Sequence, residues 1–287
     1  MGDLLVLWDV DGTLLNAGGV GGDLYRVVFE KLFGCSLEAY APMAGRTDRA
    51  IILQTLELAG ISQPRRYVDH FIWELNEHAR SVREAVAARG YALPGVAAAL
   101  AALAAAWVPD RSRDARPAGS GSLRHQVLAG VGGRSGPVSS GAANGPRRLA
   151  GTWPRRPAGR GRVRQSVLTG NVRQLADVKL AALGLRECLD MCIGAYGDDH
   201  EVRAELVHVA RRRAAAVHGR QPSDFDGPAT VVVGDTPLDI QAALAAGARA
   251  VGVATGGYRT DQLAAAGAHA VLPDLTDTQL VMGALLT

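Results

Sequence analysis

Short apolar runs alternate with helical patterns along this chain, and each of the first three runs ends in polar residues. The runs cover residues 4–8, 166–168, 230–233 and 250–254. Continuous apolar strands are typical of a parallel sheet that is buried on both faces. Helical patterns occupy 95–106, 172–184, 200–217 and 237–247. Strand alternating with helix predicts an α/β fold with a Rossmann-like parallel sheet as its core.

Residues 16–90 interrupt this alternation, because they carry helical patterns only. Leu24, Val27, Val28 and Leu32 share one face of an amphipathic helix, and a second helix begins at Thr47 and ends at Gly60. We therefore expect an all-helical cap domain over 16–90. It is inserted between the first core strand, in 1–15, and a core helix in 91–106.

A basic segment, residues 107–162, divides the core a second time. It is rich in Gly, Arg, Pro, Ser and Ala and has no apolar period. Residues 107–165 hold twelve arginines and two acids, a net charge of +10, so the rest of the 287-residue chain carries −7. We expect a disordered insert without catalytic residues, after which the core resumes over 163–287.

Nucleic-acid binding through the basic segment is the alternative from a different functional class. The segment has few aromatic residues for stacking and no nucleic-acid-binding motif. We therefore expect no nucleic-acid partner. A steep salt dependence of DNA or RNA retention, lost on removal of the segment, would favour the alternative.

Composition and cysteine usage exclude several classes of protein. A chain that is 48% hydrophobic and 21% charged can bury a sizeable core, which excludes wholesale disorder. Its longest apolar run has about 14 residues, fewer than the roughly 20 of a membrane span, and no secretion leader opens it. We expect a cytoplasmic protein with no membrane partner. Cys35, Cys188 and Cys192 match no disulfide or zinc pattern and are expected to be buried thiols.

Two acidic motifs follow the first and third apolar runs. Asp9 and Asp11 lie in the sequence Asp-Val-Asp-Gly-Thr, and alternation along a strand puts both on one side. Asp235 and Asp239 follow the run 230–233, with Pro237 at a helix start. Parallel strands bring their carboxyl ends to one edge of the sheet. Four carboxylates there predict a Mg²⁺ site, since Mg²⁺ prefers hard oxygen ligands.

Thr169 ends the second apolar run and precedes Gly170 and Asn171. A hydroxyl together with backbone N–H groups at a helix start can hold an anion, although an ordinary helix cap explains the same residues. Lys179 follows on the next helix. The chain has 29 arginines and only two lysines, which suggests that Lys179 is present for its compact charge.

These pieces, in this order, resemble the haloacid dehalogenase superfamily of phosphohydrolases. Residues 9–13 match its first motif completely, Thr169 matches the second, and Asp235 with Asp239 match the fourth. The block 16–90 occupies the place of the helical cap in the phosphoglycolate-phosphatase-like branch. The third motif departs from the common pattern, because the expected region, 198–203, contains no lysine. We assign that role to Lys179, with Arg203 as the alternative.

The resemblance implies a mechanism and a site. Asp9 would attack phosphorus, and Asp11 would protonate the leaving oxygen and later activate water. Mg²⁺ would be held by Asp9, the Asp11 carbonyl, Asp235 and Asp239. Thr169, the Gly170 N–H and Lys179 would stabilise the equatorial phosphoryl oxygens. Asn171 would also bind the substrate, as would Arg46 of the cap, which could meet a carboxylate or second phosphate.

We therefore expect a Mg²⁺-dependent phosphatase acting on a small phosphorylated metabolite, similar to phosphoglycolate phosphatase. Alternatives within the superfamily are a phosphosugar mutase and a phosphonate or pyrophosphate hydrolase. Because Asp11 is present, phosphoryl chemistry is favoured over dehalogenation. The sequence names neither the substrate nor the oligomeric state.

Overall fold

The computed structural model describes residues 3–108 and 161–287. Within them, the core is a six-stranded sheet in the order β4-β5-β1-β6-β7-β8. Five of its strands are parallel and β4 pairs antiparallel with β5. The strands are β1 (Leu4–Trp8), β4 (Trp107–Val108), β5 (Gly161–Val167), β6 (Thr230–Gly234), β7 (Arg249–Val253) and β8 (Ala270–Leu272). The expected α/β class and parallel sheet are confirmed.

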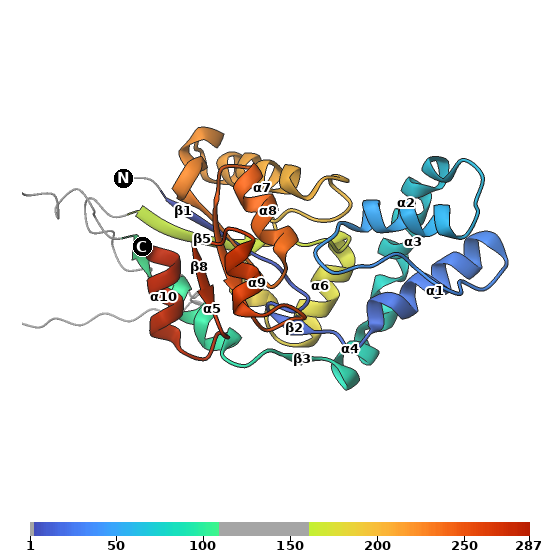
Figure 1. Ribbon diagram of the computed structural model, residues 1–287, viewed down its shortest axis with the longest axis horizontal. Helices are drawn as coiled ribbons and strands as arrows, with labels where there is room; N and C mark the ends of the chain where they lie inside the picture. The colour runs from blue at the N-terminus through green and yellow to red at the C-terminus, as the bar shows by residue number, and fades with distance from the viewer. Residues whose placement is uncertain (1–2, 109–160) are drawn as a thin grey trace, which may run out of the picture. The chain divides into compact units, whose positions relative to one another are not determined.

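Helices cover both faces of this sheet, which explains why its strands read as continuous apolar runs. Leu4, Val6 and Trp8 of β1 join one apolar cluster, and Leu5 and Leu7 join the opposite one. The first face is packed by α5 (Val96–Ala105), α6 (Arg173–Ala182) and α10 (Thr278–Leu286). The second is packed by α7 (Arg203–His218), α8 (Pro237–Ala245) and α9 (Thr260–Ala265) (Figure 1).

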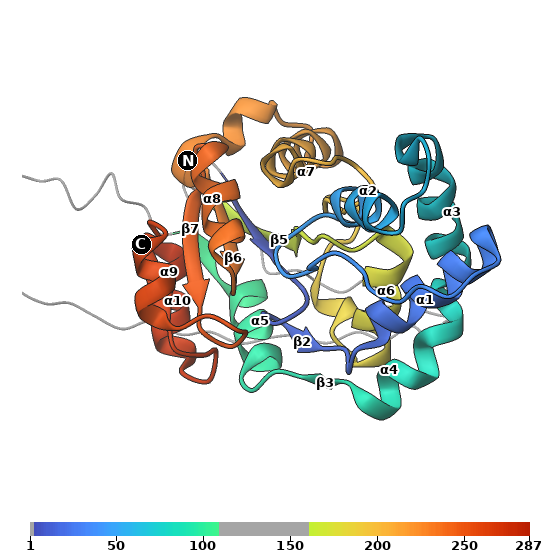
Figure 2. The ribbon, with the colours of Figure 1, turned by 45° about the vertical axis from the view of Figure 1, so that its right-hand side comes forward.

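The cap contains α1 (Val20–Phe33), α2 (Asp48–Leu58), α3 (Val68–His78) and α4 (Arg83–Arg89). The chain enters and leaves it through a two-stranded ladder of β2 (Leu15–Asn16) and β3 (Tyr91–Ala92). The cap has its own apolar cluster, which includes Phe71 and Leu75 of α3. Figure 2 shows α1, α2 and α3 grouped beside α6. A helical cap between the first strand and α5 agrees with the expectation from the sequence.

Helix α6 belongs to both clusters. Its Ala176 and Leu180 pack in the core, whereas its Leu175 and Val178 pack against the cap helices. The helix that follows Thr169 is therefore held between the two parts of the molecule.

Two local features differ from expectation. Strand β5 begins at Gly161 rather than near 166, because Asp3 accepts hydrogen bonds from the Arg162 N–H (2.9 Å) and from the Arg164 guanidinium (3.2 Å). These bonds allow polar residues to occupy a strand. The expectation of buried thiols is wrong for Cys35 and Cys192, which are exposed.

The basic insert that we expected to be disordered lies almost wholly outside the described residues, except at its ends, where 107–108 pair with 161–162. Across the described part of the chain, no helix combines the length and apolar character needed to cross a lipid bilayer.

Candidate active site

The polar residues predicted from the strand ends meet at the carboxyl edge of the sheet. Asp9 follows β1, Asp235 follows β6, and Thr169 follows β5 with Leu168 between them. These three strands are neighbours in the sheet, with β1 in the centre. A cavity of about 380 Å³ opens over this edge, and cap residues including Tyr25, Tyr40, Met43 and Ile51 form its other wall.

Asp9, Asp235 and Asp239 form a buried carboxylate cluster. One oxygen from each lies within 4.8 Å of one from each of the others. Burial is tight: Gly12 and Gly256 flank Asp235, and a Cβ at either glycine would overlap its carboxylate. Thr13 Oγ1 donates to Asp235 Oδ1 at 3.1 Å.

The start of α8 fixes Asp239. Thr236 N–H and Oγ1 donate to Asp239 Oδ2 at 3.0 and 2.7 Å, and the Asp239 N–H donates back to Thr236 Oγ1. This is a capping box, with Pro237 in the first turn as the sequence predicts. The capping box satisfies Asp239 Oδ2 with two hydrogen bonds, so Oδ1 is the oxygen that faces the carboxylate cluster.

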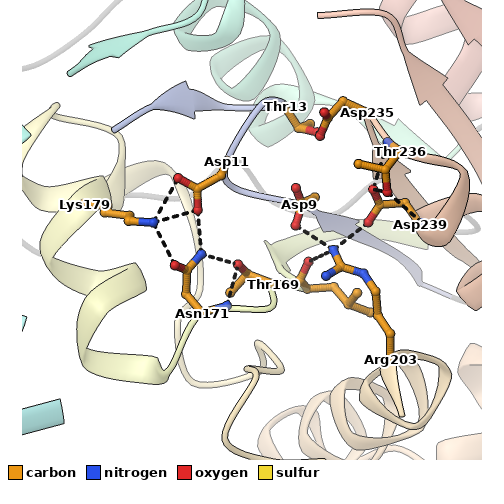
Figure 3. A network of polar contacts seen from close by, with 11 residues as sticks. Asp9, Asp11, Thr13, Thr169, Asn171, Lys179, Arg203, Asp235, Thr236 and Asp239 are labelled. Atoms are coloured by element: carbon orange, nitrogen blue, oxygen red, sulfur yellow. Dashed lines mark hydrogen bonds and ion pairs between the residues drawn. The ribbon is translucent and has the colours of Figure 1, made fainter. Parts of the chain in front are cut away.

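Arg203 is the cation that contacts this cluster. Its Nη2 donates to Asp9 Oδ1 at 2.6 Å, to Asp239 Oδ1 at 2.5 Å, and to the Leu168 carbonyl at 3.4 Å. The side chain is only 8% exposed, so these ion pairs are shielded from solvent. Figure 3 shows Arg203 reaching from α7 toward Asp9 and Asp239.

The charges of the cluster do not cancel, and its pKa values reflect this. Three carboxyl groups share one guanidinium, so full ionisation would leave a net charge of −2. Burial, reinforced by repulsion from Asp239, raises the pKa of Asp9 well above its ordinary value. Burial and Asp239 likewise raise the pKa of Asp235 to about 7. A divalent cation would balance this charge, and three hard oxygen ligands suit Mg²⁺.

Asp11 lies apart from that cluster and is half exposed to the cavity. Lys179 Nζ donates to its two carboxylate oxygens at 2.9 and 2.7 Å, and Asn171 Nδ2 donates to Oδ2 at 2.7 Å. Asn171 also joins Lys179 (2.7 Å) and Thr169 Oγ1 (2.8 Å). Figure 3 shows this second network beside the Asp9 cluster.

The two cations considered for the third motif therefore have different partners. Arg203, the alternative from the sequence, contacts Asp9, while Lys179, the first choice, contacts Asp11. Both are buried and both line the cavity.

The cap residue Arg46 also lines the cavity, but its guanidinium is occupied inside the cap. It donates to the Pro42 carbonyl (3.1 Å), Gln54 Oε1 (2.6 Å) and the Ala50 carbonyl (3.3 Å). Its contact with a substrate remains a prediction. Sequence reasoning did not single out Asp48, which lines the cavity next to Tyr25 and is buried. Its place at a helix start, two residues after Arg46, is a signal that could have found it.

A family model described as HAD-hydrolase-like matches residues 204–278, which contain Asp235 and Asp239. Over this segment the chain is similar to the haloacid dehalogenase-like hydrolases. No curated protein matches its sequence.

Three solved structures share the fold across nearly the whole chain. A predicted phosphatase from Clostridium acetobutylicum has a TM-score of 0.54 at 13% identity, covering 99% of this chain and 100% of that one. A Lactobacillus plantarum protein, provisionally named a phosphoglycolate phosphatase, also has a TM-score of 0.54, at 14% identity, with 98% and 100% covered. A Bacteroides vulgatus protein, provisionally named a β-phosphoglucomutase, has 0.50 at 15%, with 99% and 91% covered.

Proposed function

We propose that this chain is a Mg²⁺-dependent phosphatase that hydrolyses a small phosphomonoester through an aspartyl-phosphate on Asp9. The observation that carries the proposal is the pair of separately held carboxylates at the end of β1. Asp9 is buried and paired with Arg203, whereas Asp11 is half exposed and held by Lys179 and Asn171. Two neighbouring carboxylates in different surroundings suit a nucleophile and a proton carrier.

Asp9 and Asp11 have different roles in the two chemical steps. A carboxylate oxygen of Asp9 forms a bond to phosphorus as the bond from phosphorus to the ester oxygen breaks. Asp11 gives a proton to that departing oxygen. In the second step Asp11 takes a proton from water, whose oxygen attacks the phosphorylated Asp9 and releases phosphate. Lys179 and Asn171 fix the direction in which the Asp11 carboxyl points.

Stabilisation of the phosphoryl oxygens falls to the second-motif residues and the cations. Thr169 Oγ1 and the Gly170 N–H lie at the carboxyl end of β5 and line the cavity together with Lys179. Donors fixed before the reaction are worth more than mobile ones, because they need no reorganisation when charge develops. We assign the third-motif role to Arg203, since it touches Asp9 itself.

The metal ligands would be the carboxylates of Asp9, Asp235 and Asp239, with the Asp11 carbonyl as the family resemblance implies. The raised pKa values of Asp9 and Asp235 show that one guanidinium does not offset the repulsion among these carboxylates, which supports a divalent cation. When bound, Mg²⁺ would neutralise phosphate charge and lessen its repulsion by Asp9.

The test is a screen of phosphate release from small phosphomonoesters, phosphoglycolate included, with and without Mg²⁺. Metal-dependent release from one of them supports the proposal. Transfer of the phosphoryl group between two positions of a sugar would indicate the mutase alternative. Activity only on phosphonates or pyrophosphate would indicate those hydrolases. No turnover of any of these compounds would overturn the proposal.

A further inference from the structure

The first turn of α6 obtains its capping groups from the cap domain. Residue Val172 at its N-cap supplies no side-chain acceptor. Instead, the Val172 N–H donates to Asp48 Oδ2 at 2.6 Å, and the Gln174 N–H donates to Asn76 Oδ1 at 3.1 Å. Asp48 is the first residue of α2, and Asn76 lies on α3. Unsatisfied N–H groups at a helix start are costly, so the two parts of the molecule share one helix terminus.

The segment of the cap that contains Asp48 also contacts two core loops, one at Gly170 and one at Gly197. We call residues 44–49 the cap loop. The Asp48 N–H donates to the Gly170 carbonyl at 2.7 Å, and the Arg49 N–H donates to the Gly197 carbonyl at 3.3 Å. A Cβ on Gly170 would overlap the Arg46 carbonyl, and one on Gly197 would overlap the Gly170 carbonyl. Glycine is thus required at both core positions for the cap loop to approach.

These two core loops carry the groups that hold Asp9 and Asp11. The Gly170 loop continues through Asn171, which binds Asp11, into α6, whose Lys179 also binds Asp11. The Gly197 loop continues to Glu201, whose carbonyl accepts from Thr47 Oγ1 at 2.7 Å, and two residues later to Arg203. The Gly197 N–H donates to the Asn171 carbonyl at 2.8 Å, which joins the loops.

Asp48 is central to this arrangement. Its side chain is 5% exposed, and its two oxygens have separate partners: Oδ1 accepts from the Tyr25 hydroxyl at 2.7 Å and Oδ2 from the Val172 N–H. One carboxylate therefore links α1, α2 and the start of α6.

We propose that Asp48 is a positioning residue: by capping α6 from the cap domain, it makes the placement of Asn171 and Lys179 on Asp11 depend on a docked cap. The chemistry is then available only when the cap loop covers the substrate. This inference rests on the proposed phosphatase function. It assigns Asp48 no contact with the reacting atoms.

A first experiment tests, without an activity assay, whether Asp48 and Asn76 stabilise the start of α6. Hydrogen exchange of the backbone amides of 172–175 is measured in wild type, Asp48→Ala, Asp48→Asn and Asn76→Ala. We expect about tenfold or faster exchange there in both alanine variants, because each removes an acceptor from the first turn of α6. Asp48→Asn should keep wild-type protection, since its amide oxygen still accepts from Val172. Val28→Ala removes volume from the apolar cluster but no acceptor from α6, and it should leave these amides unchanged.

A second experiment separates positioning from a general loss of structure. An alkyl phosphate needs its leaving oxygen protonated, whereas an activated aryl phosphate such as p-nitrophenyl phosphate needs this much less. Asp48→Ala should lower kcat/KM, which reports formation of the aspartyl-phosphate and not its hydrolysis, roughly ten- to a hundredfold more for the alkyl ester than for the aryl ester. Asp48→Asn should restore the wild-type ratio, and Val28→Ala should not change it.

The outcomes keep the two proposals distinct. Unchanged exchange at 172–175 in Asp48→Ala, or equal losses on both esters, would overturn the positioning role. If Asp48→Ala does not fold, Asn76→Ala gives both readouts. If the wild type hydrolyses no phosphomonoester in the screen, the proposed function fails. The exchange data still decide whether the cap domain stabilises the start of α6.

Discussion

Arg203 Nη2 lies 2.6 Å from Oδ1 of Asp9, so a buried guanidinium at the start of α7 holds the carboxylate that follows β1. The two residues are 194 positions apart in the sequence. The same nitrogen contacts Asp239, which makes Arg203 the link between the first and fourth motifs.

The nucleophile is tested by Asp9→Asn. The change keeps the shape of the side chain but removes its charge and its attacking oxygen. Turnover should fall on the order of 10⁴-fold or more, as for loss of a covalent nucleophile. Steady-state phosphate release measures this, with Asp261→Asn on the exposed surface as a control that retains activity. A variant with a tenth of wild-type turnover would rule out Asp9 as nucleophile.

The roles of Arg203 and Lys179 can be distinguished by comparing substrates with different leaving groups. Arg203→Ala should lower kcat roughly 10²–10³-fold for alkyl and aryl phosphates alike, because Arg203 acts at Asp9 and the phosphoryl group. Lys179→Ala should penalise the alkyl ester more, because Lys179 orients Asp11. Comparing kcat/KM for both esters in both variants decides the assignment, because hydrolysis of the aspartyl-phosphate is the same for both. A selective alkyl penalty in Arg203→Ala would exchange the two roles.

Mg²⁺ binding is measurable without turnover. A ligand that binds only the folded state at about 100 times its Kd adds about 2.7 kcal/mol of stability. Mg²⁺ should therefore raise the Tm of the wild type. Asp235→Asn should abolish that rise, because it removes one of three clustered carboxylates. An equal Mg²⁺ shift in wild type and variant would place the metal elsewhere.

Asp48 predicts a pH dependence of stability. Burial raises the pKa of Asp48 to about 6 from 3.8, so the folded state binds its proton more tightly than the unfolded state. The stability from this group is complete below about pH 4 and is lost as the pH rises through about 6, in total about 3 kcal/mol at most.

The asparagine in Asp48→Asn cannot titrate, so the variant does not lose stability from this position as the pH rises. Urea unfolding of wild type and variant, in EDTA, should therefore give a stability difference that shifts in favour of the variant between about pH 4 and about pH 8. Parallel curves over that range would mean that Asp48 is not buried as a carboxylate.

Arg46 could serve substrate specificity or the structure of the cap, and a comparison of two substrates distinguishes these roles. If it reads a distal anionic group, Arg46→Ala should penalise a substrate with such a group and spare a simple aryl phosphate. Because its guanidinium is bound to three acceptors within the cap, we expect similar kcat/KM losses on both. A penalty confined to the anionic substrate would favour the specificity role.

The strand ends were predictable because their signal is local. A strand buried on both faces must be apolar throughout, so β1 and β6 stand out as runs, and the polar residues after them stand out as exceptions. Asp9, Asp235 and Thr169 then meet because parallel neighbouring strands end at one edge. Strand β5 was less clear, because the paired arginines in its first half hide the apolar signal.

The sequence by itself determined the alternation of strand and helix, the helical cap, and the acids at the strand ends. Each of these depends on residues that are neighbours in the chain. Only the tertiary structure decided which cation serves which acid and gave Asp48 its partners. The direction of Arg203, Lys179 and Asp48 depends on how α7, α6 and α2 pack, and a helix presents the same local pattern whichever neighbour its polar side chains meet. Partners more than a hundred residues apart leave no mark on the spacing within either segment.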